Sequence, residues 1–196
     1  LIMRVAFIGL GEMGTHMARH LAKARPTIVW NRTHAKAMAH ETAHGTTAAI
    51  SLISCAEATT IFTCLPTSAE VNMAVSALLP VIKPSTLWID CTSGDPAVSR
   101  KIAHRLESAG CRFLDAPLSG GPAGADAGSL TVMVGGSADD FAEALPLMQA
   151  TFGGKVSHVG PVGAGQTIKS LNNLLNAAHM LIGAEALIAL KRAGVQ

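Results

Sequence analysis

Charged residues are scarce in this 196-residue sequence: they make up 14% of it, and the formal net charge is only +2. So small a charge argues against nucleic acid or a membrane surface as a partner, because both attract strongly basic proteins. Basic clusters interleaved with aromatic residues are also lacking. Hydrophobic residues reach 49%, which is ample for a buried core. The length suits one domain of about 150 residues plus a further segment.

Cysteines are few and far apart: Cys55, Cys64, Cys91 and Cys111 form no C-x-x-C motif. Three of them lie in or beside apolar runs, so we expect buried, reduced thiols in a cytoplasmic protein. The N-terminal apolar run is short and leads directly into a glycine-rich turn, which does not fit a signal peptide. No segment reaches the roughly 18 uninterrupted apolar residues of a membrane span.

Three glycines follow an apolar, β-branched run at residues 5–8 with the spacing G-x-G-x-x-G, and a helical pattern comes next. Gly9 permits a sharp turn off the strand, Gly11 lets the backbone approach a phosphate, and Gly14 lets the helix pack closely. The helix N-terminus offers N–H groups to an anion. Glycine-rich turns often bind nothing, but this strand–turn–helix context predicts a dinucleotide site. The expected cofactor contacts of the turn are Gly9, Leu10, Gly11, Glu12, Met13 and Gly14.

The second predicted strand ends in Asn31, Arg32 and Thr33, at the place where NAD-binding folds carry an acidic residue for the ribose hydroxyls. That acid is absent. Asn31 can still bond a ribose oxygen, Arg32 can pair with a 2′-phosphate, and Thr33 can contact that phosphate and cap the next helix. We therefore expect NADP, with NAD as the alternative, although a simple helix-capping turn has a similar sequence.

Strand and helix patterns alternate along most of the chain. This alternation predicts an α/β fold of the Rossmann type, with a doubly wound, mostly parallel sheet and right-handed crossovers, over residues 1–162. The expected strands are 3–8, 27–30, 59–64, 86–90, 112–115, 130–134 and 156–159. The expected helices are 13–23, 34–44, 68–79, 96–109 and 138–152.

Residues 163–196 have a different pattern, a single helix from about 164 to 193 that contains no proline. At about 1.5 Å per residue it would be ~45 Å long. It is apolar on several faces, so something must cover it. We expect this helix to open an all-helical domain, and the cover to come from a partner chain or from the rest of a longer protein.

Other candidate site residues follow further predicted strands. Leu65, Pro66 and Ser93 lie at the strand ends where open α/β sheets bind ligands, and they could hold the nicotinamide ribose. Ordinary turn chemistry would look nearly the same. Ser119, with Gly120 and Gly121, could present a hydroxyl and backbone N–H groups to a carboxylate, although a plain turn would again look similar.

Lys169 is the strongest chemical signal on the long helix. Asn173 lies four residues later on the same face, and Asn172 and Asn176 are three and seven residues away. Polar groups on an apolar helix are costly unless they have partners or a function. A lysine can act as a general acid–base once burial lowers its pKa. Spacing alone leaves a snorkelling lysine beside a polar seam equally open.

Two histidine pairs have helical i, i+4 spacing, His16 with His20 and His40 with His44. No carboxylate or third ligand is placed in the sequence to complete either pair. We therefore expect no metal site.

Three of these motifs occur together in the β-hydroxyacid dehydrogenases, the family of 3-hydroxyisobutyrate, tartronate semialdehyde and 6-phosphogluconate enzymes, and the chain resembles that family over essentially its whole length. Residues 7–14 resemble the cofactor fingerprint. Residues 115–121 resemble the substrate motif D-A-P-V-S-G-G, with Leu118 in place of valine. Residues 163–173 resemble the catalytic motif G-x-G-x-x-x-K-x-x-N-N.

The resemblance implies hydride transfer between NADP, or NAD, and a small 3-hydroxy acid similar to 3-hydroxyisobutyrate, or its semialdehyde. Lys169 would handle the hydroxyl proton and Asn173 would orient the substrate. The other implied contacts are Ser119, Gly120 and Gly121 for the substrate carboxylate, and Leu65, Pro66 and Ser93 for the cofactor. Two alternatives are an inactive NADP-binding scaffold and an imine reductase. Lys169 argues against both, because such relatives lose or replace the lysine.

The chain departs from the family after Gln196, where family members continue into a helical domain that closes the site and forms much of a dimer interface. The start Leu1-Ile2-Met3 also looks unlike a natural initiation. We therefore expect a truncated or partial sequence, and a homo-oligomer formed through the long helix and the missing domain.

Overall fold

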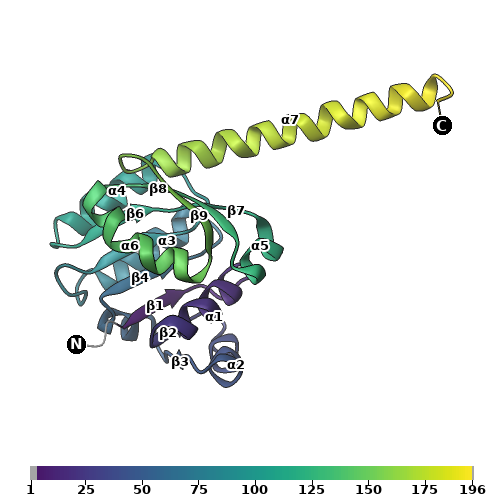
Figure 1. Cartoon of the computed structure of the whole chain (residues 1–196). Coiled ribbons are helices and arrows are strands. Elements are labelled where there is room, and N and C mark those ends of the chain that lie inside the picture. The colour runs from purple at the N-terminus through teal and green to yellow at the C-terminus, as the bar shows by residue number, and fades with distance from the viewer. Residues whose placement is uncertain (1–3, 196) are drawn as a thin grey trace.

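The computed structural model describes residues 4–195 and is built around one mixed sheet with helices on both faces (Figure 1). The strands are β1 Val5–Ile8, β2 Thr27–Trp30, β3 Thr47–Ala48, β4 Thr60–Thr63, β5 Leu87–Asp90, β6 Arg112–Asp115, β7 Leu118–Ser119, β8 Leu130–Gly135 and β9 Gly153–Gly160. The helices are α1 Gly14–Ala24, α2 His34–His44, α3 Ser68–Leu78, α4 Pro96–Glu107, α5 Gly121–Ala127, α6 Ala138–Thr151 and α7 Ala164–Arg192, with a 3₁₀ helix η1 at Leu52–Glu57.

The sheet has the strand order β3-β2-β1-β4-β5-β6-β8-β7, and β9 pairs with β8. All pairs from β3 to β6 are parallel, and the order reverses between β1 and β4. This confirms the predicted doubly wound Rossmann-type fold. The sheet is mixed beyond β6, because β8 runs antiparallel to both β6 and β7. The crevice at the reversal is where such sheets bind ligands.

The last residues of five parallel strands lie in one row across the sheet. Ile8 pairs with Trp30 and Thr63, Thr63 pairs with Asp90, and Asp90 pairs with Asp115. The loops after β1, β2, β4, β5 and β6 therefore emerge at a single edge. Every candidate cofactor residue of the sequence analysis lies on one of these loops or on the helix that follows it.

Alternate side chains of β1 enter two different hydrophobic clusters, one on each face of the sheet. Phe7 packs with Phe62 and Phe152 under α1 and α6, and the rings of Phe62 and Phe152 meet edge to face at 5.7 Å. Ile8 packs with Trp88 on the side of α3 and α4. Strands buried on both faces account for the continuous apolar runs in the sequence.

Local sequence signals set most helix ends. Thr67 and Glu70 form a reciprocal capping box at the start of α3, Asp95 caps α4, and Gly45 ends α2 in the left-handed region. The bounds of α2, β2 and β6 match the prediction, and the other predicted elements differ by a few residues at their ends. Met3, the expected first residue of β1, lies outside the described residues.

The prediction missed four short elements, β3, β7, η1 and α5. Two of them are strands of two residues, too short for an alternating pattern to show. Helix α5 has seven residues, begins with Gly121 and Pro122, and ends in the left-handed Gly128. Its glycine content hid it from a reading based on helix propensity.

Helix α7 leaves the domain and extends away from it (Figure 1). Its first turn is buried at Gly165 and Gln166, whereas large apolar side chains beyond it, such as Leu174 and Met180, are exposed. By length and composition alone α7 could cross a membrane: an 18-residue window has a mean hydropathy of 1.4, and none of that window is buried. The expectation that no segment could span a membrane considered only uninterrupted apolar runs. Helix α7 contains polar residues, yet its average hydropathy meets the criterion for a membrane span.

Candidate functional site

The glycine turn has the geometry that its spacing predicts. Gly9 has φ +106°, and a Cβ there would lie 2.2 Å from the carbonyl oxygen of Cys64. A Cβ on Gly14 would lie 1.9 Å from the carbonyl oxygen of Gly9, so α1 packs directly on the turn. Gly11 is exposed, with nothing within 4 Å of an added Cβ. The turn thus leaves open space at the N-terminus of α1, which fits a pyrophosphate group.

Asn31 ties this turn to the loop after β2. Its Oδ1 accepts a hydrogen bond from the Leu10 N–H at 3.0 Å, and its Nδ2 donates to the Thr33 carbonyl at 3.1 Å. The predicted ribose contact of Asn31 stays a prediction. Thr33 does occupy the N-cap position of α2, but its hydroxyl makes no capping bond, so the expected side-chain cap is wrong. The backbone serves instead, because the Lys36 N–H bonds the Thr33 carbonyl.

A groove of about 490 Å³ opens between α1 and α2 beside the turn. Its walls include Gly11, Glu12 and Lys36. The exposed Arg32 lies four residues before Lys36, just ahead of the N-cap of α2, so two cations occur close together in sequence where a 2′-phosphate is expected. Lys36 was not predicted as a site residue, and only the folded chain shows that it lines the groove beside the turn.

The histidine pairs have structural partners. His40 is buried, with Nδ1 3.0 Å from the Thr46 hydroxyl and Nε2 3.0 Å from the Thr15 carbonyl oxygen, and burial lowers its pKa. His16 does meet a carboxylate, since its Nδ1 lies 2.9 Å from Asp126 on α5. The spacing of the sequence does not show this contact, because folding brings α5 against α1. Within residues 4–195 no group of three potential ligands forms a metal site.

A buried polar network joins the ends of β4 and β5. Asp90 accepts hydrogen bonds from the Thr63 hydroxyl at 2.8 Å and from the Thr92 N–H at 3.0 Å. The Thr92 hydroxyl in turn accepts from the Leu65 N–H at 3.0 Å. Burial raises the pKa of Asp90 to about 6, against the opposing effect of these bonds. The loops that carry Leu65 and Ser93 are thereby fixed to each other.

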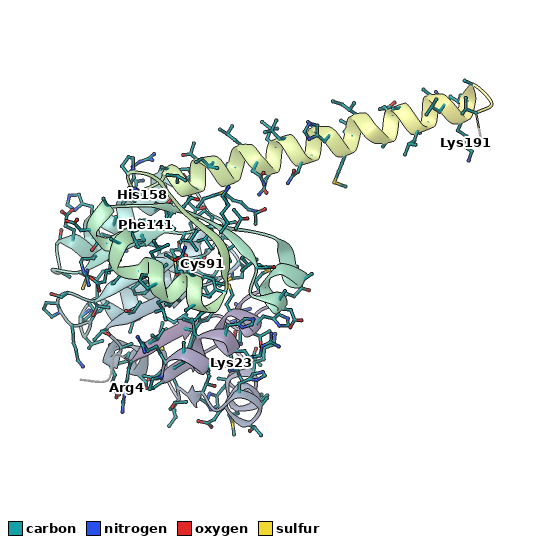
Figure 2. All side chains as sticks on the ribbon, in the orientation of Figure 1. Arg4, Lys23, Cys91, Phe141, His158 and Lys191 are labelled. Carbon is teal, nitrogen blue, oxygen red and sulfur yellow. The ribbon has the colours of Figure 1, made fainter. Side chains whose placement is uncertain are left out.

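Two cysteines flank this network but offer no nucleophile. Cys91 lies in the interior (Figure 2), and Cys64 is half-buried. Burial raises the pKa of the Cys64 thiol to about 12, so it stays protonated at neutral pH. The expected burial is confirmed for Cys55, Cys91 and Cys111.

Asp115 anchors the start of α7. Its two carboxylate oxygens accept hydrogen bonds from the Gly163 N–H at 2.7 Å and from the Gln166 N–H at 2.9 Å. A Cβ on Gly165 would lie 2.3 Å from the Met133 carbonyl oxygen, so a glycine is needed there for the helix to approach β8. Burial raises the pKa of Asp115, and the backbone N–H bonds oppose this. From the sequence alone, Asp115 is recognisable only as the first residue of the motif at residues 115–121.

Gln166 connects α7 to the loop after β5. Its side chain is buried, its Oε1 accepts from the Gly94 N–H at 2.8 Å, and its Nε2 donates to the Thr92 carbonyl at 2.7 Å. Ser93, between these two residues, is exposed. The helix of the candidate lysine and the loop of a candidate cofactor contact are thus held together by one side chain.

Lys169 follows Gln166 by three residues on α7. It is half-buried, and burial lowers the pKa of its ammonium group, as the sequence analysis expected of an acid–base lysine. Asn172 is half-buried, while Asn173 and Asn176 are exposed. A lysine in this position is better suited to give up and take a proton near neutral pH than a fully solvated one.

The candidate substrate residues flank the same strand as α7. Ser119 pairs with Thr131 of β8, and Gly120 and Gly121, with φ of +130° and +61°, lead into α5. The Met133 carbonyl, further along β8, faces Gly165 of α7. Strand β8 therefore lies between the Ser119 turn and the helix of Lys169, while the candidate cofactor residues lie at the start of α1 and on the loops after β1, β2, β4 and β5. Gln166 stands at the junction of the two halves.

Two family models match the chain. The NAD-binding domain of 6-phosphogluconate dehydrogenase matches residues 4–160, and the model described as NAD-binding of NADP-dependent 3-hydroxyisobutyrate dehydrogenase matches residues 163–196. Together they cover the sheet domain and α7.

Individual relatives agree with these models. An uncharacterised oxidoreductase of Synechocystis is 36% identical over 200 residues, covering 99% of this chain and 69% of its own length. Mouse mitochondrial 3-hydroxyisobutyrate dehydrogenase is 39% identical over 187 residues, covering 93% of this chain. The structure of 3-hydroxyisobutyrate dehydrogenase of Mycobacterium tuberculosis with L-serine aligns with a TM-score of 0.95 at 33% identity, over 100% of this chain and 67% of that one.

The chain spans only 56% of the length of the mouse enzyme. A Pseudomonas imine reductase also aligns, with a TM-score of 0.87, but at 21% identity this likeness shows the fold alone.

Proposed function

Because the chain belongs to the β-hydroxyacid dehydrogenase family, we propose that it carries the cofactor domain and the catalytic lysine of an enzyme that oxidises a small 3-hydroxy acid with NADP in preference to NAD. That it is an oxidoreductase binding NADP or NAD follows from the family. The substrate class, the preference for NADP, the residue roles, the division at residue 162 and a cytoplasmic location are parts of the proposal.

The cofactor residues follow from the geometry of the sheet edge. The open space at Gly11 and the N-terminus of α1 suit the pyrophosphate, and Arg32 with Lys36 suits a 2′-phosphate. Ser93 lies on the loop after β5 that Gln166 holds, and it would line the nicotinamide ribose, with Leu65 and Pro66 beside it. When bound, the nicotinamide ring accepts the hydride from the carbon that bears the substrate hydroxyl.

Lys169 would take the hydroxyl proton as that hydride leaves, so that the alcohol becomes a carbonyl and the lysine becomes an ammonium. This requires a neutral amine, and partial burial of Lys169 favours that form. Ser119 and the N–H groups of Gly120 and Gly121 would hold the substrate carboxylate, and Asn173 would orient the hydroxyl. In the reverse direction Lys169 would return the proton.

One observation carries the proposal: Lys169 lies a single turn beyond a helix start that Asp115 and Gln166 fix to the carboxyl edge of the sheet. Neither an inactive scaffold nor an imine reductase requires a half-buried lysine held there. The anchoring supplies the fixed geometry that a proton-transferring side chain needs.

A substrate panel tests the proposal. Purified enzyme is assayed with 3-hydroxyisobutyrate, L-serine and glycerate, each with NADP⁺ and NAD⁺, by following formation of the reduced cofactor. We expect turnover of at least one of these acids and a higher kcat/KM with NADP⁺. Reduction of cyclic imines without oxidation of any hydroxy acid would contradict the proposal.

A further inference from the structure

We propose that Gln166 is a positioning residue that holds the nicotinamide half of the cofactor site in register with Lys169. The inference rests on the proposed function. It goes further by assigning a role to a side chain that would touch neither substrate nor cofactor. Gln166 would act through the loop that carries Ser93.

The contacts of Gln166 cross a long stretch of sequence. The residue is 1% exposed, and its amide bonds Gly94 and Thr92, which lie 72 and 74 residues earlier in the chain. Both bonds reach backbone groups, so they hold the course of the loop rather than one rotamer. We call these two hydrogen bonds the clamp. Because Ser93 lies between the two bonded residues, the clamp fixes the backbone on both sides of it.

A glutamine is chemically well suited to this place. The Gly94 N–H requires an acceptor and the Thr92 carbonyl requires a donor, and a side-chain amide supplies both. A carboxylate of equal length could only accept, and a methionine of similar length offers neither strong group. Without the amide, two backbone groups would lie near a protein interior without a partner, so the loop would move to find water.

The clamp completes the network around β4 and β5. Thr92 is already tied to Asp90 through its N–H and to Leu65 through its hydroxyl. Gln166 links this network directly to α7. Displacement of the loop would therefore move Ser93, and through Thr92 also Leu65, relative to Lys169.

The adenosine half of the site has hydrogen bonds of its own that the clamp does not make. Gly11, Asn31 and Arg32 follow β1 and β2, which are separated from β5 by β4. Asn31 and Leu10 hold that half together by their own bond. Loss of the clamp should thus affect one half of the cofactor and spare the other, an effect that general destabilisation would not produce.

The test compares two ligands on the 196-residue chain. NADPH and adenosine 2′,5′-bisphosphate are titrated into the wild type, Gln166→Met and the control Thr167→Ala, which loses a bond within α7 to the Gly163 carbonyl. We expect Gln166→Met to weaken NADPH binding ~5–10-fold, the effect of losing one to two hydrogen bonds, and to leave the bisphosphate affinity unchanged. The fluorescence of bound NADPH should also shift toward that of the free form. Thr167→Ala should change neither affinity.

Circular dichroism checks folding of each variant. If Gln166→Met does not fold, Gln166→Asn carries the same expectation, because its amide is one methylene too short to span both partners. Unchanged NADPH affinity in a folded variant, or equal weakening of both ligands, would overturn the role of Gln166. A wild-type chain that binds neither ligand would overturn the proposed function itself, and with it this inference.

Discussion

Asp115 accepts a hydrogen bond from the backbone N–H of Gly163 at 2.7 Å, across 48 residues of sequence. One partner ends a strand of the sheet and the other is the N-cap of α7. The carboxylate therefore determines where the helix of the candidate catalytic lysine begins.

Asp115→Asn should destabilise the domain. The new amide group must replace one carboxylate oxygen, so it turns a donor toward the N–H of either Gly163 or Gln166 and leaves that buried N–H unpaired. We expect a loss of about 1–3 kcal/mol in the free energy of unfolding, measured by urea titration. Asp139→Asn, at an exposed position in the first turn of α6, serves as the control. Equal stability of the two variants would contradict the anchoring role.

Arg32→Asp should change cofactor choice. A charge-assisted arginine–phosphate contact contributes roughly 1.5–3 kcal/mol, so the affinity for NADPH should fall about ten- to a hundredfold while the affinity for NADH stays equal or rises. Calorimetric titration of both cofactors measures this. Arg25→Asp makes the same charge change just beyond the C-terminus of α1, and it should have little effect. If the unmutated chain binds NADPH and NADH equally well, the assignment of Arg32 is wrong.

The raised pKa of the buried Asp90 should make the stability of the domain depend on pH. Its pKa is about 6 in the folded protein and 3.8 ordinarily, so the folded state binds the proton more tightly than the unfolded state. The free energy of unfolding should therefore fall as pH rises through this interval, by about 3 kcal/mol from this group.

Asp90→Asn should remove that part of the dependence. Its Oδ1 can still accept from Thr63 and Thr92, so the network is kept while the titrating group is lost. Urea unfolding of both proteins at several pH values isolates the contribution of Asp90, since Asp115 titrates in both. Parallel pH profiles for the two proteins would refute the prediction.

The exposed apolar side chains of α7 should make the chain self-associate. Leu174, Met180 and Leu187 are 65%, 77% and 69% exposed, and contiguous apolar patches of this kind are rare on soluble monomers. The 196-residue chain should therefore associate or aggregate through α7. Removing everything after Ser170 should improve solubility and preserve NADPH binding, because Gly11 and Arg32 lie elsewhere.

Light scattering on both chains decides this. A clean monomer of the 196-residue chain, with α7 protected from amide exchange, would show that the helix finds cover within its own chain.

The sequence predicted the sheet domain well, because strands buried on both faces give long apolar runs and because glycines and prolines mark the turns. The glycine turn is the clearest case, since Gly9 and Gly14 are required by steric contacts that any Rossmann-type turn would make. Strand β7 and helix α5 escaped prediction because their form depends on pairing with β8 and packing against α1, which are not local properties.

The candidate site was predicted as a set of residues but not as a network. Asp115 and Gln166 occur in predicted motifs, but their bonding roles were not predicted. Their hydrogen bonds join segments about 50 to 70 residues apart. Thr33 lies at the predicted cap position, yet the local backbone leaves its hydroxyl without a capping bond. Spacing can place a side chain on a face, whereas only the folded chain determines which backbone group it meets.

The most direct test of the account is the turnover of Lys169→Ala, compared with Lys191→Ala as a control. Lys191 lies at the far end of the same helix (Figure 2). In the active enzyme, with a 3-hydroxy acid that the wild type oxidises, we expect Lys169→Ala to lower kcat by ~10²–10⁴ while NADPH affinity is kept and Lys191→Ala stays near wild type. Near-normal turnover in Lys169→Ala would contradict the account, because the lysine would then be structural and the proton would have another acceptor.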